Sequence, residues 1–259
     1  ARGNIAMKIN ELWQFPVKGL GGTQISQARL TADGYFPNDR KFAISNGTNA
    51  LTEAASGTWM KKASFLQLMS HEAMAKYIAL FNDSNDPPCL SIQHRDGSSL
   101  SIDPTKPDEC TRLEMFFATA LAGQLVGKPR LMTMHGQAYT DQSTPLISIA
   151  SAASLSAFAN ATGTTADNRR FRLNIIIDGN KPFGETKLIG KHVRCGDAVL
   201  RITAPVGRCV AINVDPDTGV RGQDYMAFMR QHFGHTVLGV FAKVVADGTI
   251  QPGARFEVV

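Results

Sequence analysis

The sequence lacks the patterns that identify several large classes of protein. Its four cysteines lie far apart and form no C-x-x-C pair, so neither a zinc ribbon nor an iron–sulfur cluster is expected from this chain. Its six histidines form no H-x-x-x-H or H-E-x-x-H pattern, which argues against a zinc or non-haem iron site. No G-x-G-x-x-G after a strand, no Walker A loop and no G-x-S-x-G elbow is present. These absences leave the common nucleotide-binding and hydrolase folds without support.

Long runs of one charge or of apolar residues are also missing. The net charge is +5, yet no run of five or more Lys or Arg occurs. Dispersed positive charge suits a phosphate-bearing ligand in a cleft better than a nucleic-acid surface, although it is also typical of an ordinary solvated surface. No window approaches the roughly 18 apolar residues of a spanning helix. With cysteines that do not suggest a disulfide scaffold, the sequence predicts a soluble cytoplasmic protein with no nucleic-acid or membrane partner.

The fold expected from the sequence is α+β and mainly β. Hydrophobic residues make up 43% of the 259, enough for one large domain or two modest ones. Strands are predicted over 9–15, 24–30, 41–45, 90–94, 99–102, 131–134, 146–149, 173–177, 199–203, 209–214, 237–245 and 254–259, and helices over 65–79, 110–126, 151–161 and 223–232. The Gly/Pro break at 127–130 predicts domains 1–126 and 127–259. Alternatively, the first strands, to about Arg40, pack beside the C-terminal barrel and 41–125 form the smaller lobe.

One cysteine has a setting that could support chemistry. Cys209 follows Gly207 and Arg208 at the end of an apolar run, and a DPDTG loop (residues 215–219) comes six residues later. A fixed cation beside a thiol favours the thiolate, which attacks electrophiles and binds soft metals. The alternative is a structural role, because free cysteine is among the most buried residue types. From these residues alone, both interpretations stay open.

Several motifs together resemble a known family. Arg172 opens the run R-L-N-I-I-I-D-G, and the G-R-C-V and DPDTG segments follow about thirty residues later. This order resembles the MOSC domain of molybdenum-cofactor sulfurases and of the amidoxime-reducing molybdenum enzymes. Upstream, W-Q-F-P-V-K-G (13–19) and N-D-R-K-F-A-I (38–44) resemble the N-terminal companion domain. The family usually has serine where this chain has Gly207.

The resemblance implies a MOSC β-barrel packed against a smaller β-rich N-terminal domain, and it implies molybdenum cofactor as the ligand. Phosphate needs fixed cations, the pterin needs polar partners and molybdenum needs a soft ligand. By position in the motifs, Cys209 is the expected metal ligand and catalytic residue. The expected cofactor-binding residues at these motifs are Lys18, Arg40, Arg172, Asn174, Gly207 and Arg208.

A second polar segment, A-Y-T-D-Q-S-T-P-L (138–146), resembles a stretch that lines the cofactor in these relatives. The resemblance implies that Asp141 moves protons near the metal, whereas the residue by itself is equally typical of a turn. Ser143 and Thr144 are expected cofactor contacts, with a register uncertainty of one residue. Phe241 matches an aromatic residue near the metal. Residues 51–59 depart from an arginine-containing family segment, which leaves the substrate open.

We therefore expect a molybdenum-dependent oxidoreductase that reduces small N-hydroxylated (N–O) or S–O substrates. Since the sequence has no cluster, flavin or haem motif, its electrons would come from a separate ferredoxin- or flavin-type donor protein. The alternative is a non-redox carrier that holds cofactor or a persulfide sulfur on Cys209. A nucleic-acid-binding barrel is a third possibility that rests on basicity alone.

Overall fold

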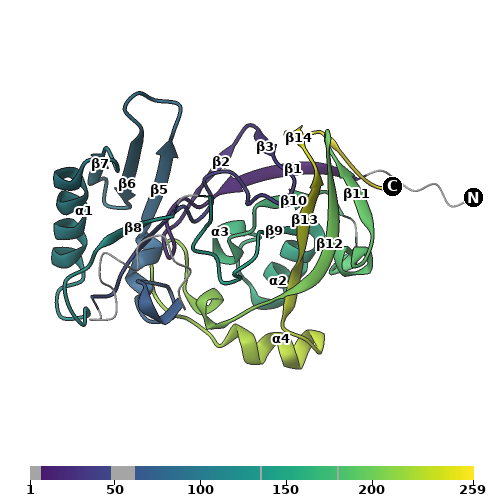
Figure 1. Ribbon diagram of the computed structural model, residues 1–259. Helices are drawn as coiled ribbons and strands as arrows, with labels where there is room; N and C mark the ends of the chain where they lie inside the picture. The colour runs from purple at the N-terminus through teal and green to yellow at the C-terminus, as the bar shows by residue number, and fades with distance from the viewer. Residues whose placement is uncertain (1–6, 48–61, 135, 180) are drawn as a thin grey trace, which may run out of the picture.

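The computed structural model describes residues 7–47, 62–134, 136–179 and 181–259. It is mainly β, with a closed barrel on one side and a smaller β-rich lobe on the other (Figure 1). This confirms the predicted fold class. Among the described residues, no helix combines the length and the apolar character needed to cross a bilayer.

Seven strands close the barrel in the order β1–β10–β9–β13–β12–β11–β15. Strand β1 closes it, because β1 pairs with β15 at Met7 and Lys8 and with β10 between Ile9 and Leu12. The pairs around the barrel are antiparallel except β9–β10. The strands are β1 (Met7–Gln14), β9 (Ile147–Ser151), β10 (Ile175–Ile177), β11 (His192–Cys195), β12 (Ala198–Gly207), β13 (Val237–Ala246) and β15 (Arg255–Val258).

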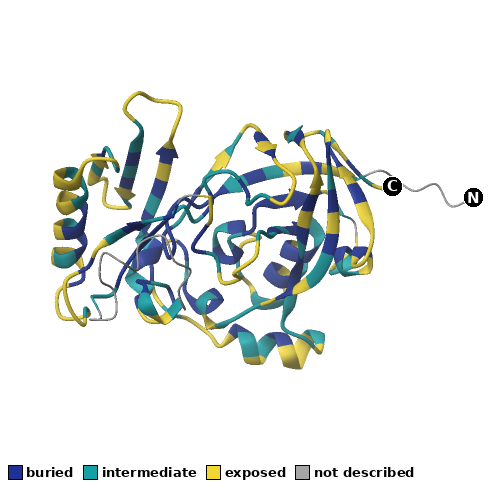
Figure 2. Ribbon diagram, viewed as in Figure 1, coloured by how far each residue is buried: buried dark blue, intermediate teal, exposed yellow. Residues whose placement is uncertain are grey.

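Buried and less buried residues alternate along the barrel strands (Figure 2). In β12, Leu200 and Ile202 are buried in the barrel core, and β13 adds Val240 and Ala242 to the same cluster. Successive residues of a strand point to opposite faces of a sheet. Phe241, between Val240 and Ala242, therefore lies on the outer face of the barrel wall.

Three helices pack against the barrel through a second apolar cluster, which includes Leu238 of β13. Each begins at a side chain that accepts a hydrogen bond from the first turn, namely Ser151, Asp167 and Asp224. Such caps satisfy backbone N–H groups that have no partner within the helix. The helices are α2 (Ala152–Thr162), α3 (Asn168–Phe171) and α4 (Tyr225–Phe233).

The smaller lobe has its own core. An antiparallel sheet, β5–β6–β7, packs against α1, which lies on the side of the sheet away from the barrel (Figure 1). Leu113 and Phe117 of α1 are fully buried in this core. The elements are β4 (Phe42–Ile44), β5 (Tyr77–Asn82), β6 (Cys89–His94), β7 (Ser99–Ile102), α1 (Pro107–Ala120) and β8 (Leu131–Thr133), with β4 paired to β8.

The helix predicted over 65–79 is wrong. The short 3-10 helix η2 (Lys62–Ser64) precedes this segment, which contains a second 3-10 helix, η3 (Glu72–Lys76), and ends in β5. Burial alternates along β5, where Tyr77, Ala79 and Phe81 are buried, so the apolar residues follow a period of two. Residues 77–82 form a strand rather than a helix because they pair with β6 along their whole length, and strand preference depends on neighbouring strands. The strands predicted over 90–94 and 99–102 are confirmed as β6 and β7, which pair antiparallel.

The first strands of the chain belong spatially with the barrel. β2 (Thr23–Ile25) pairs with β1, and β3 (Ala28–Leu30) pairs with β14 (Gly248–Ile250). The strand predicted over 24–30 is therefore two strands with different partners. The proposed sequence boundary at 126 and 127 falls between α1 and β8, at the edge of the smaller lobe.

Candidate functional site

A cavity of about 800 Å³ lies on the outer face of the barrel wall. Phe241 of β13 pairs with Ser148 of β9, and both residues line the cavity from the barrel side. Residues 62–63 and 67–69 of the smaller lobe line it as well. The volume is within the range of cofactor and ligand sites, about 300–1,000 Å³.

The cavity brings together nine of the eleven residues that the sequence suggested. They come from six separate segments of the chain. These residues are Lys18, Arg40, Asp141, Arg172, Asn174, Gly207, Arg208, Cys209 and Phe241. Ser143 and Thr144 do not line it; both are exposed, and the carbonyl of Ser143 accepts a 3.4 Å hydrogen bond from Tyr35 Oη. Their expected contact with a cofactor has no support in this geometry.

Cys209 lies at the wall of the cavity. It follows β12 and takes the N-cap position of the 3-10 helix η5 (Val210–Asn213), with its side chain half-buried. Cys195 is instead buried in the barrel core, and Cys89 and Cys110 belong to the smaller lobe, away from the cavity. Cys209 is therefore the cysteine that a ligand in this cavity could meet.

Arg208 supports the position of Cys209. Its Nε and Nη2 donate to the carbonyl of Leu238, and its Nη1 donates to the carbonyl of Phe171 at 2.9 Å. Burial lowers the pKa of Arg208 to about 10, and attraction to Cys209 partly opposes this shift. The guanidinium stays charged at neutral pH. Since three of its nitrogens bind carbonyl oxygens, Arg208 joins β13 to α3 and places a positive charge beside the thiol.

Lys18 and Asp141 form an ion pair inside the cavity. Lys18 Nζ lies 2.7 Å from Asp141 Oδ1 and donates a second hydrogen bond, 2.8 Å, to the carbonyl of Tyr139. Burial lowers the pKa of Lys18, and Asp141 opposes the shift. Burial would raise the pKa of Asp141, but Lys18, with smaller contributions from Lys62 and Arg40, holds it below its usual value. The carboxylate is therefore ionised at neutral pH, and its side chain is 59% exposed.

Arg40 and Arg172 lie against one aromatic ring. Their guanidinium carbons are 4.8 and 5.1 Å from the centre of the Phe15 ring. Arg40 binds the Asp39 carboxylate and donates to the carbonyl of Arg172. The Arg172 guanidinium makes no hydrogen bond to another residue that the structure describes. Burial lowers the pKa of Arg172 to about 9, and the nearby Arg40 acts in the same direction.

Arg172 therefore places a positive charge without a hydrogen-bond acceptor at the cavity. The residue has a positive φ of 59° and caps the C-terminal end of α3. Residues other than glycine seldom adopt this conformation. An uncompensated cation in a partly buried position favours an anionic ligand.

The side-chain amide of Asn174 has hydrogen-bond partners at its oxygen and none among the described atoms at its nitrogen. Its Oδ1 accepts hydrogen bonds from the backbone N–H and the hydroxyl of Ser148, at 3.1 and 2.9 Å. A backbone N–H can only donate, so these contacts fix the orientation of the amide. Its Nδ2 is buried and has no partner among the described atoms. Buried polar atoms are usually paired, which makes this nitrogen a candidate ligand contact.

Gly207 leaves space at the cavity wall. A Cβ built on it would meet no atom within 4 Å. The serine that the family usually has at this position would therefore fit without displacing a neighbour.

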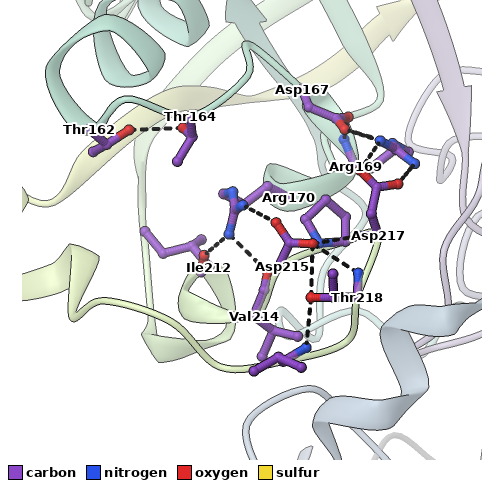
Figure 3. A network of polar contacts seen from close by, with 12 residues as sticks. Thr162, Thr164, Asp167, Arg169, Arg170, Ile212, Val214, Asp215, Asp217 and Thr218 are labelled. Carbon is purple, nitrogen blue, oxygen red and sulfur yellow. Dashed lines mark hydrogen bonds and ion pairs between the residues drawn. The ribbon is translucent and has the colours of Figure 1, made fainter.

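The DPDTG loop holds the site together rather than lining it (Figure 3). Asp215 binds Arg170 of α3 at 3.1 Å. Asp217 binds Arg169 of α3 at 2.8 Å and Arg95 of the smaller lobe at 2.9 Å. The loop thus connects the barrel side of the cavity to the smaller lobe.

Sequence reasoning missed part of the cavity lining. Ser148 and Tyr139 line it, and the Phe15 ring lies beneath two of its cations. Nothing in the sequence distinguished Phe15 from the other apolar residues of the predicted first strand. Ser148 could have been found, because it is a polar residue within an otherwise apolar predicted strand. Within the described ranges, no group of three His, Cys, Asp or Glu could hold a metal ion. The departing segment 51–59 lies outside the described residues.

Comparisons with known proteins point to one family. The family model described as the MOSC domain matches residues 137–257, and the MOSC N-terminal beta barrel domain matches residues 6–118. A search of curated proteins found no significant match.

Solved structures show weaker similarity. The YUAD protein from Bacillus subtilis is 13% identical, covering 98% of this chain and 96% of that chain, with a TM-score of 0.46. A crystal structure of a hypothetical protein is 12% identical, covering 100% and 69%, with a TM-score of 0.43. YiiM from Escherichia coli is 20% identical, covering 44% and 53%, with a TM-score of 0.34. No conclusion rests on these structures; the two family models, in the predicted order, show that the chain belongs to the MOSC family and has the N-terminal companion domain.

Proposed function

We propose that this protein is a molybdenum-cofactor-binding oxidoreductase that reduces N-hydroxylated or other N–O or S–O substrates. MOSC domains are found in molybdenum-cofactor-associated proteins, and this chain has one. The proposal goes further in assigning a redox reaction. The observation that supports it best is the cavity, where a half-buried thiol and an excess of positive charge meet within about 800 Å³.

The residues of the cavity fit the cofactor. Arg172 offers guanidinium donors for phosphate, and Asn174 offers an unpaired amide nitrogen for a polar edge of the pterin. Cys209 offers the soft ligand that molybdenum prefers, held close to the positive charge of Arg208. When bound, the cofactor would supply two-electron redox chemistry at this wall.

Proton delivery is assigned to the Lys18–Asp141 pair. Removing oxygen from an N–O substrate consumes protons, so a titratable group is needed near the leaving oxygen. Asp141 is ionised at neutral pH and is suited to accept a proton, whereas burial makes the Lys18 ammonium a better donor than an exposed lysine. The 2.7 Å contact lets a proton pass between them. Asp141 thus acts with Lys18 and not as a lone acid.

The electrons would come from a separate donor protein of the ferredoxin or flavin type. The chain's sequence has no C-x-x-C pair and no dinucleotide fingerprint with which to hold its own electron carrier. A small chemical reductant can replace the donor in a first assay.

Metal and pterin analysis of protein made in a cofactor-competent host tests the proposal directly. We expect about one molybdenum and one pterin per chain, together with reduction of a hydroxylamine by reductant. A Cys89→Ala variant is the control, because Cys89 lies away from the cavity. Molybdenum-replete protein that reduces neither N–O nor S–O compounds would overturn the redox assignment.

The same analysis distinguishes the carrier alternative, which the half-buried position of Cys209 at an open wall also suits. A cyanide-labile persulfide on Cys209 without molybdenum would support a sulfur carrier. Steep salt-dependent binding of DNA would instead support a nucleic-acid role.

A further inference from the structure

A second, much smaller cavity lies between the barrel and the smaller lobe. Its volume is about 20 Å³, room for roughly one water-sized species. Gly21 and Ile78, at a bridge between the lobes, are among its apolar and backbone lining. Its polar lining consists of four arginines: Arg95, Arg169, Arg170 and Arg172.

Carboxylates balance three of these arginines. Arg95 and Arg169 share Asp217. Arg169 also binds Asp167, and Arg170 binds Asp215 (Figure 3). None of the three carboxylate residues in this network lines the cavity, whereas all four arginines do. The carboxylates counted are Asp167, Asp215 and Asp217.

Arg170 and Arg172 leave donors unsatisfied. Arg170 gives its terminal nitrogens to the carbonyls of Ile212 and Val214 and to Asp215, but its buried Nε has no partner among the described atoms. The Arg170 side chain is 4% exposed. Arg172 makes no side-chain hydrogen bond to a described residue. Four guanidinium groups therefore meet three carboxylates, which leaves one positive charge.

We propose that this cavity binds one small monovalent anion, with chloride as the expected occupant. One negative charge would balance the four arginines, and the ion would accept from donors that otherwise lack a partner. The cavity has room for one such species. This inference does not depend on the proposed reaction, because it concerns the junction of the two lobes rather than the thiol.

Such an ion would also influence the large cavity. Arg172 lines both cavities. An anion on the smaller side lowers the positive charge that Arg172 offers to a phosphate on the larger side. Because coupling between two sites is reciprocal, chloride should weaken phosphate binding and phosphate should weaken chloride binding.

The test measures thermal unfolding of the purified protein in sodium chloride and in sodium gluconate at equal ionic strength. We expect a saturable, chloride-specific rise in Tm on the order of 2–4 °C. Crystals soaked in bromide should show one anomalous peak among the four arginines. A water or an empty cavity there, with equal Tm in the two salts, would overturn the proposal. So would a peak confined to the large cavity.

Two variants separate this site from general salt effects. Val214→Ile adds a methylene at the small cavity and should abolish the chloride response, whereas Val206→Ile, which lines the large cavity, should keep it. If Val214→Ile fails to fold, Arg95→Gln removes one of the four charges at a partly exposed position and should reduce the apparent chloride affinity severalfold. Arg194→Gln, at an exposed position on β11, is the matched control. An unchanged response in Arg95→Gln would contradict the inference.

Discussion

Lys18 Nζ and Asp141 Oδ1 lie 2.7 Å apart, although 123 residues separate them in the sequence. Lys18 follows the first barrel strand, and Asp141 precedes β9. The contact changes what each residue can do. The Lys18 ammonium already has a carboxylate partner before any phosphate binds, and the Asp141 carboxyl is ionised at neutral pH because Lys18 lowers its pKa.

Replacing Asp141 tests the proton-transfer role. We expect Asp141→Asn to retain molybdenum and pterin while slowing turnover by roughly 10²-fold or more, as is usual when a positioned acid or base is lost. The measurement is kcat in cofactor-replete protein. Normal turnover would reduce Asp141 to a turn residue, with protons delivered by water.

The same substitution has a pH signature. The pKa of Asp141 is lowered in the folded state, so its contribution to stability is present above its unfolded value near 3.8 and is lost as the pH falls through the folded value. Asp141→Asn should therefore be less stable than the parent at pH 7, by about 1 kcal/mol or less for this exposed partner, and the difference should shrink below pH 4. Urea unfolding at both pH values measures it, with exposed Asp197→Asn as the control. A difference that does not change with pH would count against the ion pair.

Cys209→Ala should abolish redox turnover and leave part of the pterin bound. The substitution removes the proposed metal ligand, while Arg172 and Asn174 remain at the cavity. Molybdenum content, pterin content and turnover are the three readouts. Cys110→Ala, half-buried but away from the cavity, should behave as the parent does. Full turnover in Cys209→Ala would show that the ligand assignment is wrong.

Substitutions of Arg172 and Arg40 should differ in their effect on the stability of the cofactor-free protein. Arg172→Gln should cost roughly ten- to a hundredfold in affinity for phosphate-bearing cofactor, about 1.5–3 kcal/mol, with little change in the stability of the cofactor-free protein. Arg40→Gln should lower that stability as well, because Arg40 binds Asp39 and the carbonyl of Arg172. The resemblance implied that both bind the cofactor. Equal apo melting temperatures for the two variants would contradict this distinction.

Gly207→Ser should fold normally. A Cβ at this position meets nothing within 4 Å, so the unfolding free energy should change by no more than about 0.5 kcal/mol. Gly207 lines the cavity, and the family usually has serine at this position, so the added hydroxyl would be available to a ligand. Thermal melting checks the fold, and pterin retention shows whether the hydroxyl improves binding. A large loss of stability would mean that a side chain at position 207 collides with its neighbours.

Local patterns predicted much of the barrel but not its site geometry. Leu200 and Ile202 alternate with less buried residues, which is enough to identify β12. At Tyr77–Asn82 the apolar residues fit both a helix and a strand, and pairing with β6 decided between them. Sequence motifs identified Cys209 and Arg172 through resemblance, since spacing alone cannot place residues of different segments in one cavity.

Ser143 and Thr144 show the limit of motif transfer. The resemblance left their register uncertain by one residue, and neither lines the cavity in the structure. The partners of Lys18 and Arg208 were likewise beyond local reasoning. Each depends on segments 30 or more residues away, joined only when the lobes and strands assemble.

The closure of the barrel by β1 sets an order of events during synthesis. Met7 and Lys8 emerge from the ribosome first among the barrel residues, yet they pair with Phe256 and Arg255. At translation rates of ~5–20 residues per second, this strand waits on the order of 12–50 seconds for its last partner. Until then the Met7–Lys8 end of β1 lacks its partner strand β15 and presents unpaired backbone groups, which can recruit other strands. The nascent chain is thus most exposed to misassembly late in translation, when the smaller lobe is already complete.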